Sequence, residues 1–84
     1  METRIALIGI IVEEKDAIHE LNQLLSQNSS YILGRMGIPH TDKNVSVISI
    51  VIDAPADIIS SLSGKIGMLS GISSKTVYTK SRNK

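Results

Sequence analysis

Three segments of this chain read as β-strands that are apolar on both faces, and only two helical segments separate the expected strands. The three segments are Ile5 to Val12, Tyr31 to Ile38 and Val45 to Ile52. A strand with one face in water alternates apolar and polar residues, whereas a strand that is covered on both faces does not. Two short helices cover one face of a small sheet, so the other face needs another cover. In so short a chain, we expect that cover to be a second copy of the chain.

The composition favours a small aliphatic core and excludes several kinds of site. Eighty-four residues form one domain, in a size range where oligomerisation often supplies missing burial. The chain has no Phe, Trp or Cys, which excludes disulfides, thiolate metal sites and cysteine catalysis within one chain. A net charge of +1 gives no electrostatic reason to expect nucleic acid or a membrane surface as a partner.

The apolar run that opens the chain is neither a membrane span nor a good secretion signal. It ends at Val12, and is far shorter than the roughly 20 residues that cross a bilayer. Glu13, Glu14 and Lys15 follow it, where a signal peptide would carry small residues for cleavage. We therefore expect a cytoplasmic protein with no membrane contact.

Hydrophobic periodicity and turn signals predict the element order βαββαβ. The four expected strands cover residues 3–12, 31–38, 45–52 and 72–79, with a hairpin loop at 39–44. The two expected helices begin at residues 13–16 and 53–55. This is the ferredoxin-like (split βαβ) arrangement of the α+β class, in which a four-stranded antiparallel sheet carries both helices on one face. Residues 1–80 then form one domain, and residues 81–84 a short basic tail.

Two glycines flank an arginine in the second expected strand, at Gly34, Arg35 and Gly37. Glycine inside a strand usually marks a bulge or a close approach of backbones, so this segment is a candidate anion-binding site on the sheet. The alternative interpretation is that both glycines permit tight packing between two sheets, with Arg35 in an ion pair across the interface.

Gly64 and Lys65, near the end of the second expected helix, form a second candidate ligand site. The segment Gly64–Gly67 also matches the GxxG loop with which KH domains clamp single-stranded nucleic acid. Against that interpretation, Leu62 and Ile66 keep helical spacing, a strand follows in place of a helix, and there is no basic patch or stacking aromatic. Direct nucleic-acid binding is therefore not expected.

The sequence holds no recognisable catalytic or metal-binding pattern. His19 and His40 occur without thiols and without an HxH or HExxH spacing. Copies of His40 could meet in an oligomer, but a solvated loop histidine is the favoured interpretation. No serine lies in a nucleophile elbow. We predict neither enzymatic activity nor a bound cofactor.

Two longer motifs carry a family resemblance. They are Ile32–Pro39 (ILGRMGIP) and Ser61–Ile72 (SLSGKIGMLSGI). With the spacing between them, they resemble the small bacterial proteins called iron-only hydrogenase system regulators, over nearly the whole chain from Arg4 to Lys80. That family is similar to ACT domains and to the C-terminal domain of the nickel-responsive repressor, which share the βαββαβ fold and assemble through their sheets. The resemblance implies a regulatory or ligand-sensing role associated with hydrogenase maturation genes.

The resemblance does not extend to a known ligand. Amino-acid-binding ACT domains usually carry an Asp-x-Pro-Gly-like turn after the first strand, where this chain has Val12–Lys15 (VEEK). The nickel repressor binds its metal through a cysteine and several histidines, a set that this chain lacks. The repressor also has a separate DNA-binding segment, for which this sequence offers no room before Arg4. We therefore expect any role of this protein in transcription to pass through a protein partner.

The sequence thus predicts an ACT-like domain that forms a dimer or tetramer through the open face of its sheet. The expected role is non-catalytic, either sensing of a small molecule or docking to a partner protein in hydrogenase-related regulation. Any ligand is expected at the subunit interface near Gly34, Arg35 and Gly37, with Gly64 and Lys65 as the second candidate. The competing prediction is a purely structural interaction module that binds no ligand.

Overall fold

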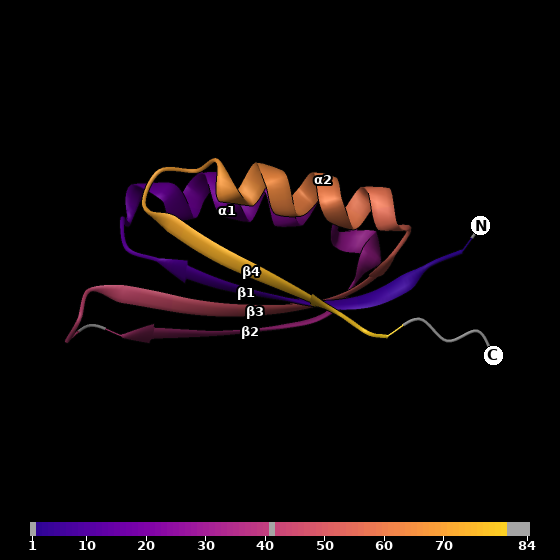
Figure 1. The fold of residues 1–84 in the computed structure, drawn as a ribbon. Coiled ribbons are helices and arrows are strands. Elements are labelled where there is room, and N and C mark those ends of the chain that lie inside the picture. The colour runs from indigo at the N-terminus through magenta and orange to yellow at the C-terminus, as the bar shows by residue number, and fades with distance from the viewer. Residues whose placement is uncertain (1, 41, 81–84) are drawn as a thin grey trace.

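The computed structural model describes residues 2–40 and 42–80, and its strands and helices form two layers (Figure 1). The strands are β1 (Arg4–Val12), β2 (Ile32–His40), β3 (Val45–Ala54) and β4 (Ile72–Tyr78). The helices are α1 (Asp16–Gln27) and α2 (Ala56–Gly67), with a 3-10 turn η1 (Ser29–Tyr31) after α1. The predicted βαββαβ order is confirmed. The predicted basic tail, residues 81–84, lies outside the described residues.

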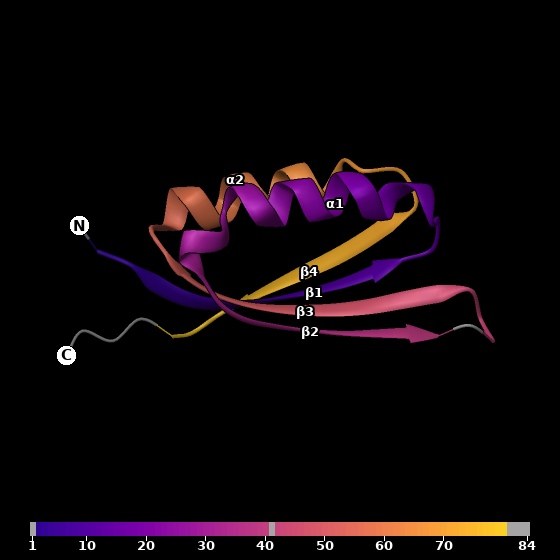
Figure 2. The same cartoon turned by 180° about the vertical axis from the view of Figure 1, so that it is seen from behind.

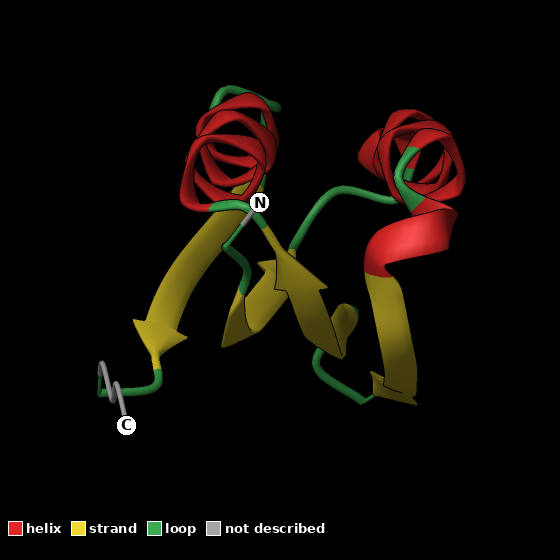
Figure 3. Ribbon diagram, turned by 90° about the vertical axis from the view of Figure 1, so that its right-hand side faces the viewer, coloured by secondary structure: helices red, strands yellow, loops and turns green. Residues whose placement is uncertain are grey.

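The four strands form one antiparallel sheet in the order β2-β3-β1-β4. Both helices lie on the same face of this sheet, as the views from the two sides show (Figure 1, Figure 2). Seen along the layers, the helices run side by side above the strands (Figure 3). The predicted ferredoxin-like fold, with two helices on one face, is therefore confirmed.

The core lies between the helices and the face of the sheet beneath them. Successive residues of a strand point to opposite faces, so every second residue of β1 and β3 points into this core. The largest fully buried side chains of the described residues are all aliphatic and come from both layers: Ile8, Ile10, Leu21, Leu25, Ile50, Ile52, Ile59, Leu62 and Ile66. This agrees with the aliphatic core expected from a chain without Phe or Trp.

The β2–β3 hairpin is longer than the sequence predicted. The expected loop began at Pro39, but β2 continues through Pro39 to His40 and β3 begins at Val45. Proline is tolerated here because β2 is an edge strand, where an N–H that points away from the sheet makes no ladder hydrogen bond. The hairpin consequently projects past the turn between β1 and α1 (Figure 1).

The turn between β1 and α1 is joined to the turn between α2 and β4. The backbone N–H of Glu13 donates to the carbonyl oxygen of Gly71 at 2.7 Å, and the hydroxyl of Ser70 donates to Glu14 Oε1 at 3.4 Å. Gly71 has φ of 75°, and a Cβ at this position would lie 2.5 Å from Cγ of Glu14. Glycine is therefore required at Gly71 both by the left-handed backbone and by the close approach of Glu14.

The chain enters the sheet at β1 and leaves it at β4, which is its neighbour. The first residue of β1, Arg4, donates from Nη2 to the carbonyl oxygen of Thr79 at 2.9 Å. Its guanidinium also lies over the ring of Tyr78, 4.6 Å from the ring centroid, in a cation–π arrangement. These contacts hold the outer ends of β1 and β4 together.

Candidate functional site

The face of the sheet that points away from the helices is apolar and open to solvent. Its large apolar side chains come from all four strands and keep between 36% and 63% of their surface exposed: Ile5, Leu7, Ile11, Met36, Ile38, Val47, Val51 and Val77. We call these eight residues the open face. In β1 and β3 they alternate with the core residues, so both sides of the two central strands are apolar.

The pairing register arranges the open face in rows that cross the sheet. From β2 to β4, the rows are Gly34, Val51, Leu7 and Val77; then Met36, Ser49, Gly9 and Lys75; then Ile38, Val47, Ile11 and Ser73. At the centre of the middle row, Ser49 has a short side chain and Gly9 has none. A Cβ on Gly9 would meet only the carbonyl oxygen of Lys75, at 4.0 Å. An opposing surface can therefore approach closely at the centre of the face.

One end of the open face is hollowed. A hollow of about 220 Å³ is bordered there by Ile5, Leu7, Val51 and Val77. Because this lining is largely apolar, the hollow suits an apolar side chain of a partner better than a polar ligand.

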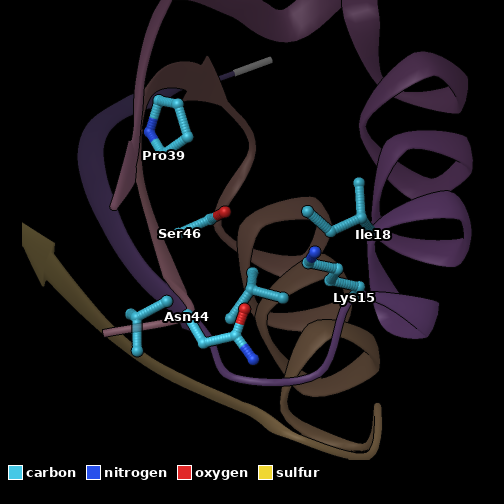
Figure 4. Close-up of a pocket in the computed structure, with 7 residues that line it drawn as sticks. Lys15, Ile18, Pro39, Asn44 and Ser46 are labelled. Atoms are coloured by element: carbon cyan, nitrogen blue, oxygen red, sulfur yellow. The ribbon is translucent and has the colours of Figure 1, made fainter. Parts of the chain in front are cut away.

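A different hollow, of about 170 Å³, lies on the helix side of the sheet, between the projecting hairpin and the first turn of α1 (Figure 4). We call it the hairpin pocket. Its lining is partly apolar and partly polar: Val12, Ile18, Pro39 and Val45, with Lys15, Asn44 and Ser46. In Figure 4 the polar ends of Lys15, Asn44 and Ser46 face the space between the hairpin and the helix. Across residues 2–40 and 42–80, none of these three side chains is hydrogen-bonded to another residue.

The structure separates the residues of the first predicted ligand site. Gly34 belongs to the open side of the sheet, whereas Arg35 and Gly37 lie opposite core residues of β3, on the helix side. The guanidinium of Arg35 donates to Oδ1 of Asn22 on α1 at 3.3 Å. The bulge that the glycines suggested falls between Ile32 and Gly34, where the register with β3 shifts. These three residues do not share one surface, because neighbouring residues of a strand point to opposite faces.

The second predicted pair, Gly64 and Lys65, lies in the last turns of α2. It is thus on the other side of the sheet from Gly34. Lys65 borders a hollow of about 260 Å³ between the two helices, and Gly64 is exposed with no atom near the position of a Cβ. Because α2 is continuous to Gly67, no GxxG loop of the KH type forms here.

Sequence reasoning missed the hairpin pocket. Its residues come from three separate segments, and neither their types nor their spacing marks a site. The one available signal was the length of β2. A strand predicted to continue through Pro39 would have placed the hairpin beside the start of α1. The pocket is a product of strand length, which periodicity predicts less well than strand identity.

Within the described residues, no group of three or more His, Cys, Asp or Glu side chains is arranged to hold a metal ion. The side chain of His40, the alternative metal ligand, lies outside the described part of the structure. Neither α1 nor α2, the α-helices of residues 2–40 and 42–80, has the length and apolar character needed to cross a bilayer.

A family model and a solved structure match nearly the whole chain. The TM1266-like family, described as an iron-only hydrogenase system regulator, matches residues 4–76. The structure of protein TM1266 from Thermotoga maritima aligns with a TM-score of 0.90 and 38% sequence identity, over 94% of this chain and 100% of that chain. Among curated proteins, no sequence matches the chain.

More distant structures share the fold. A formyltetrahydrofolate deformylase from Pseudomonas putida KT2440 aligns with a TM-score of 0.67 and 10% identity, over 93% of this chain and 30% of that chain. An unknown protein from Galdieria sulphuraria aligns with a TM-score of 0.65 and 14% identity, over 98% of this chain and 48% of that chain. At these identities the likeness shows the fold alone.

Proposed function

This chain belongs to the TM1266-like family, described as an iron-only hydrogenase system regulator, and we propose that it acts as a non-catalytic regulatory domain that assembles through its open face. In this proposal the assembled domain works in the cytoplasm, where it senses a small molecule or docks to a partner protein in hydrogenase regulation. The observation that carries the proposal is the open face.

The composition of the open face supports assembly. Soluble monomers rarely expose a contiguous apolar patch of more than a few hundred Å², yet here eight large apolar side chains lie on four adjacent strands. The charged residues on this side, Asp53 and Lys75, lie at its margins, at the end of β3 and on the edge strand β4. An apolar centre with a polar rim is the usual anatomy of a protein interface.

Assembly alone would also suit a purely structural interaction module. The hairpin pocket favours the sensing role, because it lies on the helix side of the sheet and stays accessible when the open face is covered. A docking surface for a partner protein would likewise have to lie on the helix layer or at the sheet edges.

Native mass spectrometry of the purified protein tests the proposal, because it reports subunit number and any retained small molecule together. We expect a dimer or tetramer for the wild-type chain and a monomer for Leu7→Lys, which would bury an unpaired charge in the interface. Met68→Lys is the matched control, since Met68 lies just after α2 and is 85% exposed. A wild-type monomer, or a Leu7→Lys variant that still assembles, would refute assembly through this face.

A further inference from the structure

We infer that the hairpin pocket binds a small monocarboxylate with a short apolar chain. The inference deepens the proposed function by giving the sensor a ligand class and a place, and it rests on that function only for the regulatory meaning of binding. Binding itself depends on the pocket alone.

The pocket has the size of a small organic molecule. It is bounded by the first turn of α1, the end of β2 and the start of β3. A single water needs roughly 10–15 Å³ of such space, so a hollow of about 170 Å³ accommodates a molecule of several heavy atoms. Val12 lines it from the buried side, at 2% exposure.

The apolar lining calls for a hydrocarbon part in the ligand. Ile18 is half-buried on α1, and Pro39 is exposed on β2, opposite Ser46. The side chains of Ile18 and Pro39 are thus both partly exposed to water. A short branched chain would displace that water, which is the usual source of affinity in small-molecule sites.

The polar lining calls for an acceptor of hydrogen bonds. Among the described residues, Lys15 is the charged residue that lines the pocket and carries only donors, while Asn44 and Ser46 offer an amide and a hydroxyl donor. No carboxylate of the described residues lines the pocket, so a ligand ammonium group would find no counter-charge among them. A carboxylate would accept from all three side chains, with a charge-assisted hydrogen bond from Lys15.

The surroundings of Lys15 select a singly charged ligand. Glu13, Glu14 and Asp16 flank it in sequence. None of them lines the pocket, and Glu14 is turned toward Ser70. Their charge still lowers the local potential, which penalises a dianion such as phosphate more than a monocarboxylate in direct contact with Lys15.

The test is an amide NMR titration of the full chain with isovalerate, a branched monocarboxylate that matches both linings. We expect saturable shifts at the amides of Asn44, Val45 and Ser46. Isoamyl alcohol and isoamylamine, which keep the carbon chain and lose the carboxylate, should bind more weakly by about ten-fold or more. Inorganic phosphate should produce no saturable shift at these amides.

Variants assign the effect to the pocket. Lys15→Gln removes the charge from an exposed side chain and should weaken isovalerate binding by about ten-fold or more. Lys80→Gln, a matched change at an exposed residue after β4, should leave the affinity unchanged. Isovalerate that gives no saturable shift at these amides overturns the site. Equal binding by the alcohol, the amine or the Lys15→Gln variant overturns the carboxylate class.

The two proposals fail separately. A wild-type oligomer that does not bind isovalerate removes the ligand inference and leaves assembly standing. A wild-type monomer that binds isovalerate in the hairpin pocket removes the assembly proposal and leaves the ligand inference standing.

Discussion

The two faces of the sheet are built from alternate residues of the same strands, but only one is covered. On the helix side, Ile8 and Ile50 are fully buried, whereas their neighbours Leu7 and Val51 on the other side are 44% and 36% exposed. Both faces are aliphatic, so hydropathy does not distinguish them. The difference is that the helices of the described residues, α1 and α2, both cover the same face. Apolar patterning therefore predicts that a surface needs burial, and says little about what buries it.

The largest expected effect separates the two faces within one strand. Ile50→Ala should lower the free energy of unfolding by roughly 2–5 kcal/mol, because it leaves a cavity in the core. Val51→Ala, one residue along, should cost about 1 kcal/mol or less in the monomer, because Val51 is already partly exposed. Urea unfolding in the Leu7→Lys background, where assembly does not contribute, gives both values. Equal losses would mean that the two faces are equally covered.

The next effect concerns the contact between the β1–α1 and α2–β4 turns. Gly71→Ala should destabilise the fold by about 1–3 kcal/mol, because alanine is strained at φ of 75° and its Cβ meets Glu14. Gly67→Ala is the matched control, since no atom lies within 4 Å of its Cβ position and alanine favours the helix. Thermal unfolding checks this prediction: the melting temperature should fall in Gly71→Ala and rise in Gly67→Ala. A neutral Gly71→Ala would show that the two turns can separate without cost.

Val51 should contribute more to the affinity between subunits than to the stability of the monomer. In the otherwise wild-type chain, Val51→Ala should raise the dissociation constant of the oligomer by about ten-fold, since burying one or two methyl groups is worth ~1.4 kcal/mol. Analytical ultracentrifugation over a concentration series measures the change. Lys65→Ala, on the helix layer, should leave the dissociation constant unchanged. An unaffected constant in Val51→Ala would move the interface away from this part of the sheet.

The smallest effect is expected at Arg35. Its hydrogen bond to Asn22 is exposed, so Arg35→Ala should change the free energy of unfolding by about 0.5 kcal/mol or less. Assembly should also persist, because Arg35 lies on the helix side of β2. Light scattering and urea unfolding together test this. Loss of the oligomer in Arg35→Ala would instead favour the sequence-based placement of Arg35 at a subunit interface.

The order of elements could be predicted because it depends on local periodicity. Leu21 and Leu25 recur at helical spacing, and the runs in β1 and β3 have the length and the Ile and Val content of buried strands. The facing of β2 could not be predicted in the same way. Where both faces of a sheet are apolar, the alternation that fixes the facing carries no information. The bulge between Ile32 and Gly34 then shifts the register with β3 as well.

The hairpin pocket could not be predicted for a different reason. Pro39 reads as a strand breaker, so β2 was expected to end before it. Only the edge position of β2 makes a proline acceptable there, and edge position is a property of the whole sheet. The pocket thus follows from tertiary structure. It was missed because the predicted end of β2 was two residues too early.

The contact between Arg4 and Thr79 gives the fold a property of a different kind. The chain enters the sheet at β1 and leaves it at β4, and these two strands are paired. The entry and exit points of the domain therefore lie close together. A circular permutant, in which a short peptide joins the outer ends of β1 and β4 and the new termini lie in the β2–β3 hairpin, would preserve every strand pairing. The same closeness means that this domain can be inserted into a longer chain without separating its ends.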